Sequence, residues 1–333
     1  MKVILEASLF EPARADALEL LGLLHLGYEG RHLMTTDPLD DARVSQWLAA
    51  RGDNESQACR LAFEAGLREQ SRTQSAFSVR VQAGPFSPRV ERRQLFLSLP
   101  DALVFLRSAF RVLLEDSSRD REFVLAIAKP EWRKRLLEME TKGWLHFEHG
   151  GGLSRMPETV RDAKQSPLSR LCLWVLFDSD SLAPNKPSDA ISSFMRLCGE
   201  AVAFHCLERR AVENYIPFLA LEHWAFHGSG RRERSDNRKR TFRAFGSMTT
   251  TCQSHYNLKH GFHGDSDRDD RDNVGPLYDD LPLETLQALE HGFGSNIANL
   301  FAWHTWANWE WWMDAGQERE EGGRMIQSLF SRL

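Results

Sequence analysis

Two apolar runs in the middle of the chain end abruptly in carboxylates. Val112 to Leu114 leads into Glu115, and Trp174 to Phe177 leads into Asp178 and then Asp180. A buried parallel strand reads as such an apolar run, and an open α/β sheet places its ligands at the carboxyl ends of its strands. A lone aspartate there would be a helix cap. Acidic side chains from two strands together favour a divalent cation held against phosphate oxygens.

These carboxylates need a sheet to bring them together, and the sequence from residue 100 onward predicts one. Apolar runs alternate with helical stretches, which is typical of parallel strands joined by right-handed crossovers. The predicted fold class is therefore α/β, with a parallel sheet flanked by helices. The predicted strands are Phe110–Glu115, Trp144–His149, Leu171–Asp178 and Val202–Leu207, and the predicted helices are Pro100–Ser108, Ser118–Ala128, a helix ending at Lys164, Ser188–Glu200 and Ala211–Trp224, with Ser118 and Ser188 as N-caps.

The chain divides by pattern into three regions. Residues 1–100 mix short strands and helices, carry no chemical motif, and are predicted to form an N-terminal α+β module that binds a partner or substrate. Residues 101–226 form the predicted catalytic domain, and residues 227–333 a mostly helical C-terminal region. In the first region, strands are predicted at 2–9, 77–82 and 94–99, and helices at 45–50 and 55–66.

Composition limits the class of partner. The 333 residues carry a formal net charge of −5, which argues against a protein that coats polyanions generally, so basic patches and bound cations must attract any nucleic acid. The five cysteines include no CxxC pair and are expected to be reduced. Without an apolar run of membrane-spanning length, we expect a cytoplasmic protein with no membrane partner.

A family resemblance rests on these same segments. Glu115 after a first strand, the glycine turn Gly150–Gly152 after a second, and Asp178-Ser179-Asp180 after a third resemble a Toprim domain. The segment Leu207–Tyr215, LERRAVENY, resembles the L-x-R-R-x-x-E-N-Y stretch of the OLD (overcoming lysogenization defect) nucleases and related Toprim effectors of antiphage defence. The resemblance covers about a third of the chain, and a weaker likeness continues over His255–Phe262.

The resemblance implies a role for each acidic residue. It makes Glu115 a metal ligand and acid/base group, with Asp178 and Asp180 as further ligands. Asp116 stands where these proteins often have glycine, which shifts the spacing to the next acidic position. The implied catalytic set is Glu115, Asp178 and Asp180, and the implied ligands of two Mg²⁺ or Mn²⁺ ions are Glu115, Asp120, Asp178, Asp180 and Glu213, with Glu208 a weaker candidate than Glu213. Lys259, at an apparent turn, is the candidate catalytic cation that neutralises the scissile phosphate, and a solvated surface lysine is the alternative.

The implied activity is two-metal hydrolysis of phosphodiester bonds in DNA, with RNA as the other substrate class. An endonuclease of this kind would act as the effector of an antiphage or anti-plasmid defence system, as a monomer or homodimer. The chain has no GxxxxGK[ST] phosphate loop, although the OLD nucleases usually carry a fused ATPase. The resemblance therefore implies either an ATPase or SMC-like subunit that acts in trans or an N-terminal segment that takes over its targeting role. The alternative function is a non-catalytic subunit that binds nucleic acid and assembles a larger complex.

Two further patterns could contact nucleic acid. Tryptophans at 303, 306, 309 and 312 predict an aromatic stripe on a helix, which is more often core or subunit interface than a base-stacking surface. A basic run is the other candidate, although a solvated loop has the same composition. Its predicted nucleic-acid-binding residues are Arg231, Arg232, Arg238, Lys239 and Arg240.

Overall fold

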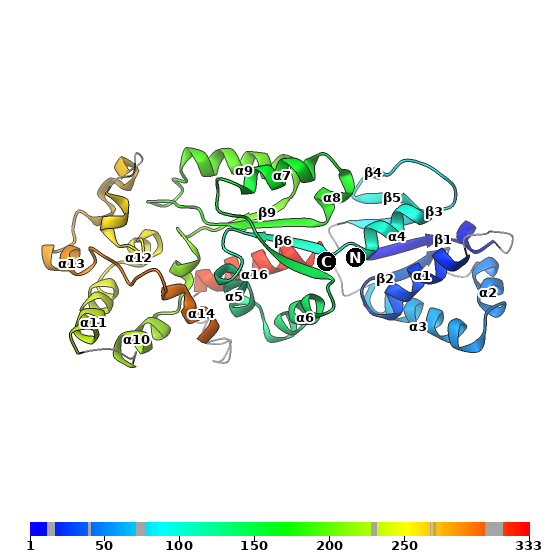
Figure 1. Ribbon diagram of the computed structural model, residues 1–333, viewed down its shortest axis with the longest axis horizontal. Helices are drawn as coiled ribbons and strands as arrows, with labels where there is room; N and C mark the ends of the chain where they lie inside the picture. Colours follow the sequence, from blue (N-terminus) through cyan, green and yellow to red (C-terminus); the bar gives the residue numbers. More distant parts are fainter. Residues whose placement is uncertain are drawn as a thin grey trace.

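Two β-sheets, both built mainly of parallel strands, organise the chain (Figure 1). The computed structural model describes residues 1–11, 17–38, 41–70, 77–227, 232–266, 268, 271–303 and 316–333. Helices flank both sheets, and the predicted α/β class is confirmed. Within the described residues, no helix is long and apolar enough to cross a membrane.

The N-terminal sheet has the strand order β2-β1-β3-β5-β4, with only the edge strand β4 antiparallel. Its valines and leucines alternate with polar residues, so Val3, Val79 and Leu95 lie side by side on the buried face. The strands are β1 (Lys2–Glu6), β2 (Leu33–Asp37), β3 (Ser78–Gln82), β4 (Arg89–Glu91) and β5 (Gln94–Ser98), and the helices are α1 (Ala17–Tyr28), α2 (Ala42–Ala49), α3 (Asp53–Gln70) and α4 (Leu99–Arg107), with a 3-10 turn at Ala7–Phe10. Helices separate β1, β2 and β3 along the chain, whereas β3, β4 and β5 follow one another without a helix between them.

The second sheet has the order β7-β6-β8-β9, and all its strands are parallel. Leu113 and Val175 face α7 and α9, whereas Val112 and Trp174 face the layer that contains α5 and α16, so both faces are buried (Figure 1). The strands are β6 (Phe110–Leu114), β7 (Leu145–His149), β8 (Leu173–Phe177) and β9 (Ala203–Cys206), and the helices are α5 (Arg119–Ile127), α6 (Pro130–Thr141), α7 (Met156–Lys164), α8 (Pro167–Leu171) and α9 (Asp189–Ala201).

The C-terminal region shares its core with the second sheet, so packing continues across residue 226. Phe123 from α5, Phe245 and Leu329 belong to one hydrophobic cluster. Helix α16 returns to the sheet, where Trp174 Nε1 donates to Ser328 Oγ at 3.3 Å. The helices of this region are α10 (Phe218–His227), α11 (Arg232–Gly246), α12 (Thr250–His255), α13 (Leu283–Ala288), α14 (Leu300–Trp303) and α16 (Gly316–Phe330), with 3-10 turns at Val212–Tyr215, Phe262–Asp265, Arg271–Tyr278 and Ile297–Asn299.

The helix predicted over Ala211–Trp224 is wrong as a single element. The chain forms a 3-10 turn at Val212–Tyr215, then becomes extended at Ile216 (φ −64°, ψ 123°), and begins α10 only at Phe218. Pro217 explains the break because the residue before a proline is disfavoured in the α region.

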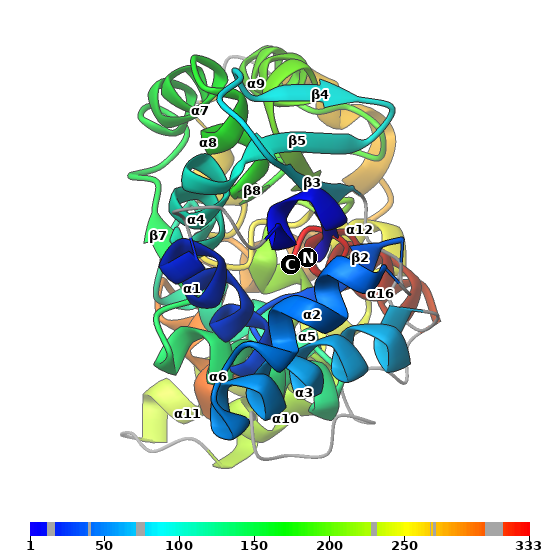
Figure 2. The ribbon, with the colours of Figure 1, turned by 90° about the vertical axis from the view of Figure 1, so that its right-hand side faces the viewer.

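The two ends of the chain meet between the sheets. The amino group of Met1 donates to the carbonyl of Leu333, and the marked termini lie side by side in Figures 1 and 2. Burial and nearby arginines lower the pKa of the Met1 amino group to about 5. Met1 also packs against the cores of both sheets, which it thereby connects.

Candidate metal centre

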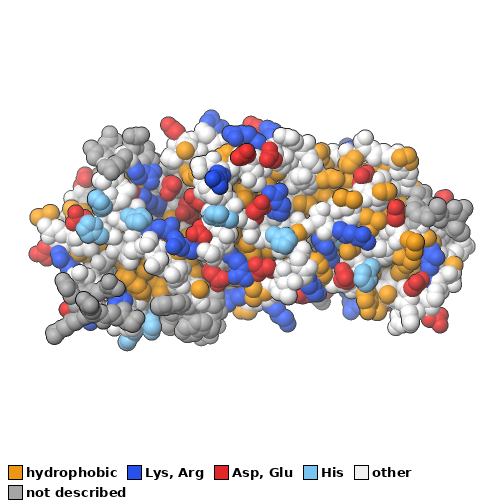
Figure 3. Space-filling model, viewed as in Figure 1, with side chains coloured by type: hydrophobic (Ala, Val, Ile, Leu, Met, Phe, Trp, Pro, Cys, Tyr) orange, Lys and Arg blue, Asp and Glu red, His pale blue; other side chains and the backbone are white. Residues whose placement is uncertain are grey.

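The predicted acidic residues lie at the carboxyl edge of the second sheet. Leu114 is in register with Leu176 of the neighbouring strand, so Glu115 lies level with Phe177, one residue before Asp178. The chain leaves β6 toward β7 on one side, while β8 lies on the other, and this reversal of strand order is where open α/β sheets form ligand sites. In Figure 3, acidic, basic and histidine side chains gather over the left-hand end of this sheet.

The Asp178-Ser179-Asp180 turn is fixed by hydrogen bonds to the segment that follows β9. Asp178 Oδ1 accepts from the Val212 amide at 3.1 Å, and Ser179 Oγ donates to the Arg209 carbonyl at 2.7 Å. The Asp180 amide donates to the carbonyl of Arg210 at 2.9 Å. Asp180 has φ +48°, a left-handed conformation that is uncommon outside glycine, and the surrounding hydrogen bonds hold it there.

The 207–215 segment (LERRAVENY) is anchored by most of its polar residues. Arg210 pairs with Asp265, with Nη1 to Oδ2 at 2.7 Å, and Asn214 Nδ2 donates to the carbonyls of Gln253 and Tyr256 at 2.8 and 2.9 Å. These bonds hold the segment against α12 and the turn after it. Glu213 does not anchor the segment in this way; the residue is 1% exposed and its side chain lies among the other acidic residues.

Five carboxyl groups interact in this region, namely those of Glu115, Asp120, Asp178, Asp180 and Glu213. Burial and the charge of Asp180 raise the pKa of Glu115 to about 7. Burial and the charge of Glu115 raise the pKa of Asp120 to about 7, and burial with Glu115 and Glu213 raises the pKa of Asp178 well above its ordinary value. These carboxyl groups, distant in sequence, therefore lie close enough to shift one another's pKa. We call these five residues the acidic cluster.

Lys259, which lies outside the sheet, faces the acidic cluster. Lys259 Nζ lies 2.9 Å from Glu213 Oε1. Burial opposes its charge, but Glu213 and Asp178 outweigh burial and raise the pKa of Lys259, so the side chain is a stable cation. One lysine cannot neutralise five carboxylates, and the remaining negative charge must be removed by protons or by further cations.

Whether a metal ion fits the acidic cluster can be judged from its carboxylate oxygens that lack hydrogen-bond partners. Among the groups that the structure describes, Glu115 Oε2 and Glu213 Oε2 are buried without a hydrogen-bond partner, and Glu213 Oε1 has only the ion pair with Lys259. Leaving such an atom unpaired costs about 1–3 kcal/mol, and more if it is charged. Carboxylate oxygens are the ligands that Mg²⁺ and Mn²⁺ prefer. The donor set therefore suits these ions, although no three His, Cys, Asp or Glu side chains of the described residues are arranged around one point. An ion would have to draw the carboxylates inward.

Asp116 caps helix α5, and Ser118, the predicted cap, does not. Asp116 Oδ1 accepts from the amides of Ser118 and Arg119 at 3.0 and 3.4 Å, whereas Ser118 already has helical angles and makes no capping bond. The Asp116 amide in turn donates to Asp120 Oδ2 at 2.8 Å. The additional acidic residue at 116 thus has a structural role, and it directs Asp120 into the acidic cluster.

Other predicted residues lie outside the acidic cluster. Glu208 is exposed and pairs with Arg324, so it is not a ligand of this site. Gly150 makes a tight turn: its amide donates to the Leu114 carbonyl at 2.7 Å, and a Cβ there would lie 2.8 Å from that oxygen. Gly151 and Gly152 both have positive φ. These features explain the glycine turn by backbone geometry.

The basic run is only partly described. Arg231 and the tryptophans at 306, 309 and 312 lie outside the described residues, as do the side chains of Arg232 and Trp303. On α11, the Arg238 guanidinium stacks 5.4 Å from the Trp224 ring, and Lys239 lies 5.8 Å from Phe226. Arg240 is exposed. These contacts hold part of the run against α10, and any binding of nucleic acid by it stays a prediction.

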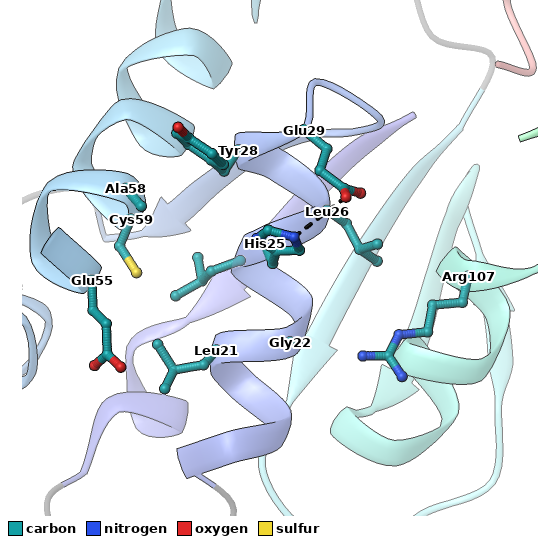
Figure 4. Close-up of a pocket in the computed structure, with 11 residues that line it drawn as sticks. Leu21, Gly22, His25, Leu26, Tyr28, Glu29, Glu55, Ala58, Cys59 and Arg107 are labelled. Atoms are coloured by element: carbon teal, nitrogen blue, oxygen red, sulfur yellow. Dashed lines mark ion pairs between the residues drawn. The ribbon is translucent and has the colours of Figure 1, made fainter. Parts of the chain in front are cut away.

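A cavity elsewhere contains none of the predicted site residues. It has a volume of about 530 Å³ and lies in the N-terminal module, where α1, α3 and α4 meet (Figure 4). His25 and Glu29 form an ion pair at one side, and Arg107 lies across α1 from Glu55 and Cys59. The cavity is lined by leucines and by charged side chains of both signs, and these show no catalytic arrangement. The acidic cluster therefore remains the candidate site.

The sequence missed several residues that support the acidic cluster. Arg268 donates to the Asp180 carbonyl at 3.1 Å, and Asp265 fixes Arg210, but both lie in a run of alternating charges that is typical of a solvated loop.

Comparison of the chain with models of protein families, with curated proteins and with solved structures gave no match.

Proposed function

We propose that the protein is a metal-dependent nuclease that hydrolyses phosphodiester bonds with two Mg²⁺ or Mn²⁺ ions. The observation that carries this proposal is a pair of buried carboxylate oxygens, Glu115 Oε2 and Glu213 Oε2, that have no hydrogen-bond partner among the described residues and lie beside Lys259. A purely structural acidic cluster would be costly to retain, since uncharged side chains of the same shape would fill the space better. The resemblance to Toprim nucleases supports the same conclusion.

Each residue has a proposed role in this chemistry. Glu115, Asp178 and Asp180, from adjacent strands, would hold one ion, and Glu213 with Asp120 would complete a second position. When bound, two such ions lower the pKa of a water and stabilise the leaving oxygen. Glu115 Oε2, which has no hydrogen-bond partner in the described structure, is the atom available to accept a proton from that water.

Lys259 would neutralise the scissile phosphate. Its ammonium already lies against Glu213, so it is held at the edge of the acidic cluster, and its raised pKa keeps it charged at neutral pH. A fixed positive charge acts on the additional negative charge that a phosphate carries in the transition state. Because these contacts involve phosphates and not bases, the site accepts DNA or RNA in principle, and we propose DNA as the substrate.

A role in antiphage or anti-plasmid defence follows from the resemblance to the OLD nucleases, and an ATPase or SMC-like partner in trans would supply the nucleotide-driven step. The described structure contains this chain alone. The proposal therefore concerns the hydrolytic subunit, located in the cytoplasm.

The test compares three substrates with the purified chain. Linear DNA, closed circular DNA and total transfer RNA are incubated with Mn²⁺ or Mg²⁺, with EDTA as the control, and products are separated by gel electrophoresis. We expect metal-dependent cleavage of DNA. Mn²⁺ binding is measured in parallel by calorimetry, because a non-catalytic assembly subunit has no need of an ordered metal pair. Absence of both cleavage and Mn²⁺ binding would contradict the proposal.

Replacing Lys259 with alanine is expected to lower the cleavage rate by about 10²-fold, since the phosphate loses its fixed counter-charge. Metal-free Lys259→Ala protein should also unfold more easily, because Glu213 then stays buried without a cation. Single-turnover cleavage and urea denaturation in EDTA measure the two effects. Lys164→Ala, which removes an exposed surface pair with Glu200, is the matched control and should change neither.

A further inference from the structure

A buried carboxylate on the last helix joins both ends of the 207–215 segment. Glu321, on α16, is only 3% exposed. Its Oε1 accepts from His205 Nε2 at 2.9 Å and from the Glu208 amide at 2.8 Å, and its Oε2 accepts from the Tyr215 hydroxyl. The same hydroxyl accepts from the Arg209 amide at 3.0 Å.

Helix α16 does not need the Glu321 carboxylate in order to pack on the second sheet. Helix α16 already buries Met325, Ile326 and Leu329 in the shared core, and Ser328 bonds to Trp174. A buried carboxylate is costly unless its oxygens are fully hydrogen-bonded. Glu321 is bonded in this way, and these bonds lower its pKa against the effect of burial. Each bond goes to the end of β9 or to the 207–215 segment, which lies beside the acidic cluster.

The geometry connects Glu321 to Glu213 through a short, rigid path. Tyr215 and Glu213 belong to the same 3-10 turn, in which the Ile216 amide donates to the Glu213 carbonyl at 3.0 Å. The first residue of that turn, Val212, donates to Asp178 Oδ1. A displacement of Tyr215 would therefore move Glu213 and disturb Asp178 together.

We propose that Glu321 is a positioning residue of the metal centre: through Tyr215 it sets the turn that carries Glu213 into the acidic cluster. This inference rests on the proposed function, because it assigns Glu321 to the metal site described above. A residue that orients ligands typically changes metal affinity by about 10- to 100-fold when it is removed. The competing explanation is that Glu321 only attaches α16 to the sheet.

Three variants of the full-length chain separate these explanations. Glu321→Ala removes the carboxylate, and Tyr215→Phe removes only the hydroxyl that links it to the turn. Ser328→Ala loosens α16 at its contact with Trp174 and has no bond to the 207–215 segment, so it is the matched control. Mn²⁺ affinity is measured by calorimetry, and the unfolding temperature is measured in EDTA.

We expect Glu321→Ala to weaken Mn²⁺ binding by about 10- to 100-fold and Tyr215→Phe by about 10-fold. Ser328→Ala should lower the unfolding temperature without changing Mn²⁺ affinity by more than about twofold. Glu321→Gln keeps an acceptor oxygen and should recover part of the affinity lost in Glu321→Ala.

The outcomes distinguish this inference from the function on which it rests. If the unaltered protein binds no Mn²⁺, both fall. If it binds Mn²⁺ and Tyr215→Phe binds equally well, the inference is wrong while the proposed metal site stands. Tyr215→Phe decides the matter even if Glu321→Ala does not fold, because it preserves the ring that packs against Phe123.

Discussion

Replacing Glu115 with glutamine is expected to stop metal-dependent cleavage and, in the same protein, to stabilise the metal-free fold. Loss of a ligand oxygen removes charge from the site and should reduce the rate by ~10³-fold or more, by comparison with the loss of a single stabilising donor. Without metal, Glu115 is a buried carboxylate among like charges, with a pKa of about 7. The amide of glutamine removes that repulsion and can donate to a neighbouring carboxylate.

Cleavage assays and urea denaturation in EDTA at about pH 8 test the two effects. The stabilisation should be on the order of 1–3 kcal/mol. Asp178→Asn should likewise abolish cleavage, because it removes a charged ligand. The fold should be retained, because asparagine keeps an oxygen that can accept from the Val212 amide. Glu208→Gln is the matched control, since Glu208 follows a neighbouring strand but pairs with Arg324 on the surface. Full activity of both Glu115→Gln and Asp178→Asn would rule out the nuclease assignment.

Divalent cations are expected to stabilise the protein more at high pH than at low pH. The pKa values of Glu115 and Asp120 are raised to about 7, so between their ordinary values and neutrality the folded state binds more protons than the unfolded state. The stability that these groups contribute is therefore complete only below their ordinary pKa values, and it is lost as the pH rises from those values through about 7. A bound cation favours the ionised carboxylates and offsets that loss.

Thermal unfolding with Mg²⁺ and with EDTA, at about pH 5 and about pH 8, measures the effect. The increase in unfolding temperature on adding Mg²⁺ should be roughly 5 °C larger at the higher pH. The double variant Glu115→Gln, Asp120→Asn should show little difference between the two pH values. An equal increase at both pH values in the unaltered protein would mean that Mg²⁺ acts elsewhere.

The second sheet could be predicted because its strands are marked at both ends. Each is a short apolar run, and glycine or acidic residues follow β6, β7 and β8, so the strand bounds were correct to within one or two residues. Helix α1 and strand β2 were missed. The sequence of α1, ALELLGLLHLGY, has leucine on most of its faces and so lacks a clear helical period, while β2 carries two threonines and an aspartate.

The acidic cluster was partly readable from the sequence, for reasons that differ between residues. Asp178 and Asp180 follow a strand directly, and Glu115 does the same, so sheet topology alone brings them together. Glu213 and Lys259 required a family resemblance, because neither follows a strand. Glu321 left no signal, since it lies 106 residues from Tyr215 and no local spacing records a contact of that range.

Because Lys259 lies after residue 226, the predicted domain 101–226 does not contain all the residues that its acidic cluster requires. All five carboxylates precede that boundary, whereas their counter-charge is contributed more than thirty residues later, by the turn after α12. A fragment that ends at residue 226 would contain the five carboxylates but would lack Lys259 and helix α16, whose Glu321 accepts from Tyr215. During synthesis the acids likewise emerge first, so protons or free cations must balance them until the rest of the chain arrives.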